Sequence, residues 1–190
     1  MNESAAHVRL VAIVGSLRAD SSNRAVFEAS RGLVPSGVAL REVSVAEVPL
    51  FNQDLEGDHE PPAVVALKAA VADADGLVVF TPEFNRSIPA VTKNAVDWLS
   101  RPFLAGPILG KPVGIVTAGP GRGDGQGCRD HLTTTIAASG GAVFDPSLGL
   151  ASITRVMTDG VVTDDEVRDR LTAWLVAFAA CAAAQQQDGA

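Results

Sequence analysis

The stretch from Val8 to Asn23 constrains the fold of this chain more than any other part of the sequence. Its first seven residues are almost all apolar and rich in Val and Ile, as expected of a strand buried on both faces of a parallel sheet. A loop rich in hydroxyl groups follows, and the run from Arg24 to Leu33 is compatible with a helix. The sequence therefore predicts a strand, a polar loop and a helix, which is the first unit of an α/β fold.

The loop after this strand has the residue types of a phosphate site. Unpaired backbone N–H groups and the positive end of a helix dipole favour an anion at such a position. Short polar side chains and a guanidinium can complete its hydrogen-bond shell, and the candidates are Ser16, Arg18, Ser21, Ser22 and Asn23. The alternative is an ordinary turn in which Ser21, Ser22 or Asn23 caps the helix.

The glycine spacing limits the kind of phosphate. Gly15 is the only glycine of this loop, so the loop lacks both the Gly-x-Gly-x-x-Gly of dinucleotide sites and the Gly-Lys-Ser/Thr of nucleoside triphosphate sites. Without glycines that let the backbone close on a pyrophosphate, the loop is better suited to a terminal phosphomonoester such as that of FMN.

Further apolar runs alternate with helical patterns along the chain. The other predicted strands cover residues 38–45, 77–81, 111–118 and 147–151, and the other predicted helices cover residues 63–72, 90–99, 128–139 and 167–184. The alternation predicts an α/β fold with a doubly wound five-stranded parallel sheet, strand order 2-1-3-4-5, and helices on both faces. We expect one domain over residues 1–190, frayed at 1–6 and 185–190.

Two more loops follow predicted central strands at their carboxyl ends, where open α/β sheets bind ligands. The loop after the third strand offers Glu83, Asn85 and Ser87, and Pro82 and Pro89 stiffen it. The loop at residues 119–127 has five glycines, which let a backbone approach a ligand closely. The first of these loops could instead be an ordinary turn, and the second a mobile surface loop.

Composition argues against several classes of protein. A net charge of −7 argues against broad nucleic-acid binding, while basic residues near the loops favour phosphorylated small molecules. Cys128 and Cys181 lie far apart without metal or redox spacing, so reduced thiols and no metal site are expected. Residues 1–6 are too short and polar for a secretory signal, and no apolar run approaches the roughly 18 residues of a membrane span, so we expect a cytoplasmic protein without membrane partners.

Two of these segments resemble the NADPH-dependent FMN reductase family of the flavodoxin-like fold, which contains bacterial quinone, chromate and azo-dye reductases. Gly-Ser-Leu-Arg-x-x-Ser-x-Asn at residues 15–23 is similar to the family's FMN phosphate loop. Residues 81–102 begin Thr-Pro-Glu-Phe-Asn-Arg-Ser-Ile-Pro and are similar to its flavin-ring loop and the following helix. The resemblance covers most of the chain.

The resemblance implies an FMN site made of three loops. The residues that would hold the phosphate are Ser16, Arg18, Ser21 and Asn23. The residues that would line the isoalloxazine ring are Pro82, Glu83, Phe84, Asn85 and Ser87 from one loop and Ala118, Gly119 and Gly121 from the other. The family usually has Tyr where this chain has Phe84, so a hydroxyl role is lost there while ring packing remains.

The implied reaction is hydride transfer from NADPH or NADH through FMN to a quinone, a flavin or another small acceptor. The cofactors carry this chemistry, so no catalytic side chain is expected, and Glu83 is interpreted as a loop anchor. No catalytic arrangement is expected of the histidines, which are His7, His59 and His131. Candidates to contact NADPH phosphates are Arg86, Arg101 and Arg122.

Two other functions stay open, a flavodoxin-type electron carrier and a flavin-binding protein without turnover. The loop at residues 119–127 has no Trp or Tyr to cover a flavin, which favours access of a second substrate and so an enzyme. The family forms dimers and tetramers through helices that here cover residues 90–99 and 128–139, so we expect a homodimer or homotetramer. The apolar stripe in the first of these helices, Val91, Ala95, Trp98 and Leu99, is expected to be shared between the sheet and a partner subunit.

Overall fold

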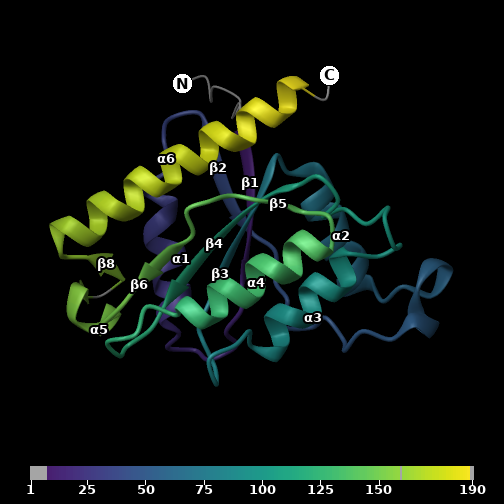
Figure 1. Ribbon diagram of the computed structural model, residues 1–190, viewed down its shortest axis with the longest axis horizontal. Helices are drawn as coiled ribbons and strands as arrows, with labels where there is room; N and C mark the ends of the chain where they lie inside the picture. Colours follow the sequence, from purple (N-terminus) through teal and green to yellow (C-terminus); the bar gives the residue numbers. More distant parts are fainter. Residues whose placement is uncertain (1–7, 159, 189–190) are drawn as a thin grey trace.

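A parallel sheet forms the centre of the molecule, whose computed structural model describes residues 8–158 and 160–188. Its main strands are β1 (Val8–Val14), β2 (Val38–Glu42), β3 (Gly76–Thr81) and β4 (Pro112–Ala118). They lie in the order β2-β1-β3-β4-β5, so the predicted doubly wound α/β fold and its strand order are confirmed (Figure 1).

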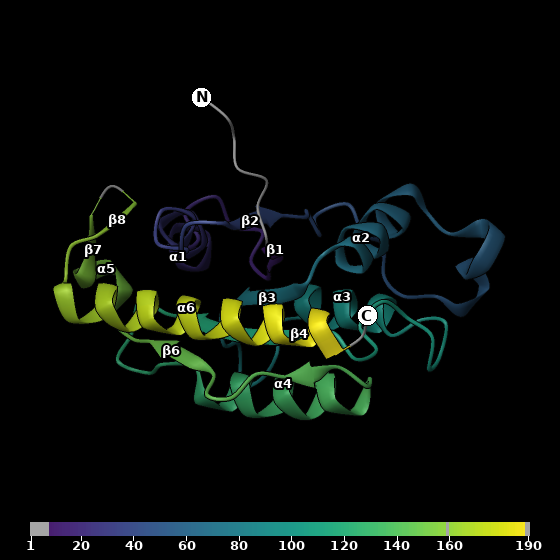
Figure 2. The ribbon, with the colours of Figure 1, turned by 90° about the horizontal axis from the view of Figure 1, so that it is seen from above.

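Helices cover both faces of this sheet (Figures 1 and 2). α1 (Ser22–Arg31) and α6 (Asp165–Asp188) pack on one face, and α2 (Pro62–Asp73), α3 (Ala90–Leu99) and α4 (Gln126–Ala138) pack on the other. Along β3, Val78 and Phe80 belong to the first core, while Leu77 and Val79 belong to the second. Because both faces are covered, β3 and β4 are buried throughout, which explains their continuous apolar sequences.

The fifth position of the sheet is divided between two short strands. β5 (Ala142–Val143) and β6 (Leu148–Leu150) each pair in parallel with β4, where a single strand at 147–151 was predicted. Between them, Pro146 has no N–H to donate to a ladder, and its carbonyl accepts a hydrogen bond from Trp174 Nε1 at 2.7 Å. The chain therefore leaves the sheet at this point and returns to it.

Several elements were not predicted. In the sequence, β6 is followed by α5 (Ile153–Val156) and by an antiparallel pair of strands, β7 (Met157–Thr158) with β8 (Val161–Val162), before α6 begins. Two 3₁₀ turns, Gln53–Leu55 and Gly57–His59, precede α2. α6 continues to Asp188, through most of the segment expected to fray, whereas residues 1–6 and His7 lie outside the described part of the chain.

Two glycines let α6 approach the sheet closely. A Cβ atom on Gly114 would lie 2.6 Å from the Trp174 ring, and one on Gly76 would lie 3.0 Å from the Phe178 ring. The two rings stack on each other with centroids 5.4 Å apart. The aromatic side chains of α6 thus occupy the space that strand side chains would otherwise fill.

The apolar stripe of α3 packs within its own chain. Ala95, Trp98 and Leu99 are fully buried in the second core, and Val91 is half-buried beside it. Trp98 Nε1 also donates to the carbonyl of Pro49 at 2.8 Å, which fixes the loop before α2. Three of the four side chains therefore leave no exposed surface for a partner.

Within residues 8–158 and 160–188, no helix combines the length and the hydrophobicity of a bilayer span.

Candidate active site

The loops after β1, β3 and β4 meet at one edge of the sheet, because parallel strands end on the same side. The N–H of Gly15, just after β1, donates to the carbonyl of Phe80 in β3 at 2.7 Å. A Cβ atom on Gly15 would overlap the hydroxyl of Thr92 in α3, so only glycine lets this loop pass so close to the helix. The three predicted ligand loops are thus brought together.

The first loop has free donors where α1 begins. Ser21 is the N-cap, and its Oγ accepts from the N–H of Arg24 at 3.3 Å, as the capping alternative expected. Ser16 and Ser22 are half-buried and Arg18 is exposed, and none of these three side chains has a hydrogen-bond partner among the described residues. The backbone N–H groups from residue 16 to residue 22 likewise meet no acceptor in the described chain, so the loop can bind an anion.

Asn23 ties this loop to the end of β4. Its Nδ2 donates to the carbonyl of Ala118 at 2.8 Å, and its Oδ1 accepts from the N–H of Ala118 at 2.9 Å. Both residues are buried. Both polar atoms of the amide therefore bind Ala118, and this pair of hydrogen bonds sets the spacing between the first and third loops.

A cavity of about 220 Å³ lies between the second and third loops. Six predicted ring-binding residues line it: Pro82, Glu83, Phe84, Ala118, Gly119 and Gly121. The other lining residues, which the sequence did not single out, are Thr117, Pro120, Gly123 and Gly125. Phe84 is 57 % exposed. The cavity has a flat apolar side chain on one wall and mostly backbone on the other.

The third loop offers fewer backbone donors than its glycines suggest. The N–H groups of Ala118 and Gly119 donate to Asn23 and to the carbonyl of Leu150, respectively. The N–H groups of Gly121, Arg122 and Gly123 meet no acceptor among residues 8–158 and 160–188. Gly121 and Gly123 also have open space where a Cβ would stand. These three residues can therefore donate to a ligand.

The second loop forms a tight hairpin. Phe84 and Ser87 exchange backbone hydrogen bonds of 3.1 and 2.9 Å, and Asn85 and Arg86 between them both have left-handed φ angles of 53° and 58°. Ser87 Oγ lies 3.0 Å from His131 Nδ1, in a second cavity of about 370 Å³. The structure thus places Asn85 at the hairpin tip and Ser87 beside α4, and neither lines the 220 Å³ cavity.

Glu83 anchors the second loop to α4. Its Oε2 accepts from the N–H of Cys128, in the first turn of that helix, at 2.9 Å. Burial, with the Glu83 charge as a smaller contribution, raises the pKa of the Cys128 thiol to about 12. The carboxylate is therefore a structural acceptor, and the thiol is not a nucleophile at neutral pH.

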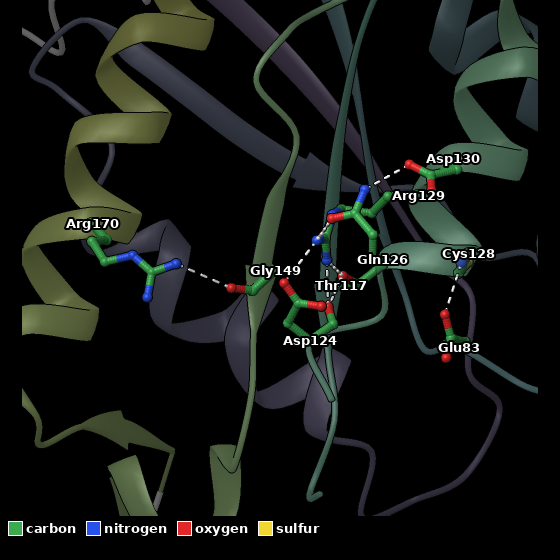
Figure 3. A network of polar contacts seen from close by, with 9 residues as sticks. All are labelled: Glu83, Thr117, Asp124, Gln126, Cys128, Arg129, Asp130, Gly149 and Arg170. Atoms are coloured by element: carbon green, nitrogen blue, oxygen red, sulfur yellow. Dashed lines mark hydrogen bonds and ion pairs between the residues drawn. The ribbon is translucent and has the colours of Figure 1, made fainter. Parts of the chain in front are cut away.

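Arg129 organises the base of the third loop, a role that its place in the sequence does not indicate. Figure 3 shows its guanidinium between Thr117 and Asp124, at 2.6 Å from Thr117 Oγ1 and 2.8 Å from Asp124 Oδ2. Burial raises the pKa of the Asp124 carboxyl, but the hydrogen bond and charge of Arg129 outweigh that effect, and the pKa is lowered. An arginine in a helix usually lies at the surface, so the sequence alone carried no signal for this contact.

The three candidate arginines for NADPH differ in their surroundings. The Arg101 guanidinium lies over the rings of Phe51, at 5.2 Å, and Phe103, at 5.9 Å, and no partner for its buried Nε occurs in the described chain. Arg86 and Arg122 are exposed and have no acidic partner among the described residues.

Within residues 8–158 and 160–188, no group of three or more His, Cys, Asp or Glu side chains could hold a metal ion.

Comparisons with known proteins show to which family the chain belongs. The sequence profile of the family described as NADPH-dependent FMN reductase matches residues 8–154. The quinone reductase of Escherichia coli (strain K12) is 34 % identical over 176 residues, which cover 90 % of this chain and 93 % of that protein. A 2-hydroxy-1,4-benzoquinone reductase of Burkholderia sp is 43 % identical over 109 residues, which are 57 % of this chain and 59 % of that relative.

Solved structures give the same result. FerB from Paracoccus denitrificans, a flavoenzyme NAD(P)H:(acceptor) oxidoreductase, superposes with a TM-score of 0.85 at 27 % identity and covers 92 % of this chain and 97 % of its own. An FMN-dependent NADH-azoreductase from Bacillus anthracis str. Ames Ancestor, solved with FMN, shares the fold at 13 % identity and a TM-score of 0.60, over 90 % of this chain and 99 % of its own. As its sequence predicted, the chain belongs to the NADPH-dependent FMN reductase family and is an oxidoreductase that uses FMN with NAD(P)H.

Proposed function

We propose that this enzyme binds FMN across the three loops and passes hydride from NAD(P)H to a quinone or another small acceptor. The observation that carries the proposal is the 220 Å³ cavity, whose lining residue Ala118 is hydrogen-bonded to Asn23 at the end of a loop with unused donors. Bound FMN would supply the redox chemistry by accepting and giving up hydride. The protein's own residues bind, orient and shield.

The phosphate end rests on the first loop. Ser16, Arg18 and Ser22 would contact the phosphate together with the backbone N–H groups of residues 16–22, because none of these donors is otherwise used in the described chain. Ser21 and Asn23, which the resemblance also assigned to the phosphate, would act by capping α1 and by holding the loop to Ala118.

The ring end rests on the cavity between the second and third loops. Pro82, Glu83 and Phe84 would face one side of the ring, and the segment from Ala118 to Gly121 would face the other. The free N–H groups of Gly121 and its two neighbours can stabilise negative charge on a reduced ring. Asn85 and Ser87 would support the hairpin that carries Phe84.

The second substrate enters from the exposed side of the same cavity. Arg86 and Arg122, which have no acidic partner in the described chain, would contact the phosphates of NADPH or NADH, whereas Arg101 is stacked on aromatic rings. The relatives from E. coli and Burkholderia sp are named for quinone and 2-hydroxy-1,4-benzoquinone reduction, which supports a quinone as acceptor.

We also propose a homodimer or homotetramer that acts in the cytoplasm. Leu50, Phe103 and Leu104 are more than 60 % exposed, and they offer apolar side chains that a partner subunit would cover. Light scattering at micromolar concentration tests this, and a monomeric mass would contradict it.

The function is tested by titrating the protein with FMN and then adding NADPH or NADH without oxygen. We expect a stoichiometric yellow complex whose flavin absorbance is lost completely on mixing and returns when 1,4-benzoquinone is added. A flavin that binds but is not reduced by either nucleotide would instead identify an electron carrier or a binding protein. An unchanged flavin spectrum at saturation would remove the cofactor itself.

A further inference from the structure

Arg129 joins the two ends of the third loop. Its Nη1 donates to Thr117 Oγ1 at 2.6 Å and to the carbonyl of Asp124, and its Nη2 donates to Asp124 Oδ2 at 2.8 Å and Gln126 Oε1 at 2.6 Å. Thr117 Oγ1 also donates to the Asp124 carbonyl at 2.5 Å. Thr117 precedes the loop and Asp124 lies near its end, so the guanidinium clamps the loop at its base (Figure 3).

The clamp is built into the interior of the protein. The Arg129 side chain is only 4 % exposed. A charged side chain is rarely buried without partners, and the hydrogen bonds to Thr117, Asp124 and Gln126 supply them. A Cβ atom on Gly149 would overlap the guanidinium and would lie 2.7 Å from the Asp124 carbonyl. Gly125 has a φ of 82°, and a Cβ there would meet Thr117 at 2.8 Å. Two glycines therefore provide the space that the arginine and the loop require.

The neighbouring residue of α4 holds the opposite wall of the cavity. The N–H of Cys128 binds Glu83 of the second loop at 2.9 Å, and Arg129 binds the third loop. Consecutive residues in one helical turn thus fix both walls of the 220 Å³ cavity, which sets the width of the slot between them.

We propose that Arg129 is a positioning residue that holds the third loop in the conformation required to receive the isoalloxazine ring. The inference rests on the proposed function for the identity of the ring, but the hold on the loop itself can be tested without a flavin. Arg129 touches no part of the cavity's open space and acts through Thr117 and Asp124.

The flavin-free test is amide hydrogen exchange of Arg129→Ala. Three hydrogen bonds join the loop to residues 150–153, and their donors are the N–H groups of Gly119, Ser152 and Ile153. These amides should exchange about tenfold faster or more in the variant. Without the hydrogen bonds of Arg129 at its base, the loop needs less free energy to open locally. Amides in the centre of β1 and β3 should not change, which distinguishes loop positioning from general destabilisation.

Arg170→Ala is the matched control. Arg170, on α6, donates to the carbonyl of the same Gly149 at 3.2 Å from the exposed side and makes no hydrogen bond to the third loop (Figure 3). It should leave the exchange rates unchanged. Gly149→Ala keeps Arg129 but removes its space, so it should reproduce the faster exchange. Arg129→Lys keeps the positive charge but lacks the guanidinium that binds Thr117 and Asp124 at the same time. If Arg129→Ala does not fold, Arg129→Lys and Gly149→Ala replace it in the test.

The flavin test compares FMN with riboflavin. Because the phosphate loop is untouched, Arg129→Ala should weaken both ligands by the same factor, about tenfold, which corresponds to about 1.4 kcal/mol. Unchanged exchange and unchanged affinities in a folded variant would overturn the proposal, as would a loss confined to FMN. Failure of the wild-type protein to bind either flavin would instead refute the proposed function, and the exchange experiment would still decide the role of Arg129.

Discussion

Replacing Asn23 with alanine should both destabilise the protein and loosen its ligand loops. Asn23 is 2 % exposed and makes two hydrogen bonds of 2.8 and 2.9 Å to one residue, Ala118, which is 3 % exposed. Truncation leaves a backbone N–H and a backbone C=O buried without partners, at about 1–3 kcal/mol each. We therefore expect a loss of about 3 kcal/mol, which in a chain of this size lowers Tm by roughly 6–12 °C.

Urea denaturation followed by circular dichroism measures the loss of stability. The matched control is Asn52→Ala, an exposed asparagine whose Oδ1 accepts one hydrogen bond from the N–H of Asp54 at 3.0 Å, and it should cost about 1 kcal/mol or less. Well below the Tm of Asn23→Ala, FMN should also bind about tenfold more weakly, because the loops for its two ends are no longer held in register. A variant as stable as the control would show that Ala118 finds other partners and that the tether is unimportant.

Further experiments test the site, the thiol and the sheet. Arg18→Ala should weaken FMN binding by roughly 10- to 100-fold, since a charge-assisted hydrogen bond contributes about 1.5–3 kcal/mol, and riboflavin should be unaffected; equal changes for both flavins in fluorescence titrations would remove Arg18 from the site. With the pKa of Cys128 raised to about 12, a thiol reagent at mildly alkaline pH should label only the half-buried Cys181 until the protein is denatured. In the unfolded chain the Cys128 thiol has its ordinary pKa of 9.0. The contribution of the buried, protonated thiol to the free energy of unfolding is therefore complete below pH 9.0 and is lost as the pH rises to about 12. Denaturation at several pH values measures this loss. Gly114→Ala should cost about 1–3 kcal/mol by crowding Trp174; an unchanged denaturation midpoint would show that α6 can shift away from the sheet at little cost.

The sheet was predictable because its central strands are buried on both faces. A run such as Leu77 to Phe80 is apolar at every position, and this pattern survives without any knowledge of the partners. The fifth strand was not predictable in detail, because its interruption depends on a contact between Pro146 and Trp174, 28 residues away. The short pair β7 and β8 was missed because two residues per strand give no periodicity to detect.

The candidate site divides in the same way. Glycines and hydroxyls at strand ends indicated three loops as candidate ligand sites, since local backbone chemistry determines where a ligand can approach, and the structure brings these loops to one edge of the sheet. Which groups stay free was a tertiary question: the N–H of Gly119 is used by Leu150, and the amide of Asn23 by Ala118. The role of Arg129 could not be predicted for the same reason, because its burial depends on the space that Gly149, which has no side chain, leaves for the guanidinium.

The close fit between α6 and the sheet also bears on how the chain is synthesised. Trp174 and Phe178 fill the space above Gly114 and Gly76 in the two most buried strands, yet they lie on α6, which follows every strand of the sheet in the sequence. While a ribosome is still translating α6, only α1 covers this face of β3 and β4, and the apolar surface that α6 will bury is available to chaperones or to other nascent chains. We therefore expect this core to close only after α6 has emerged from the exit tunnel.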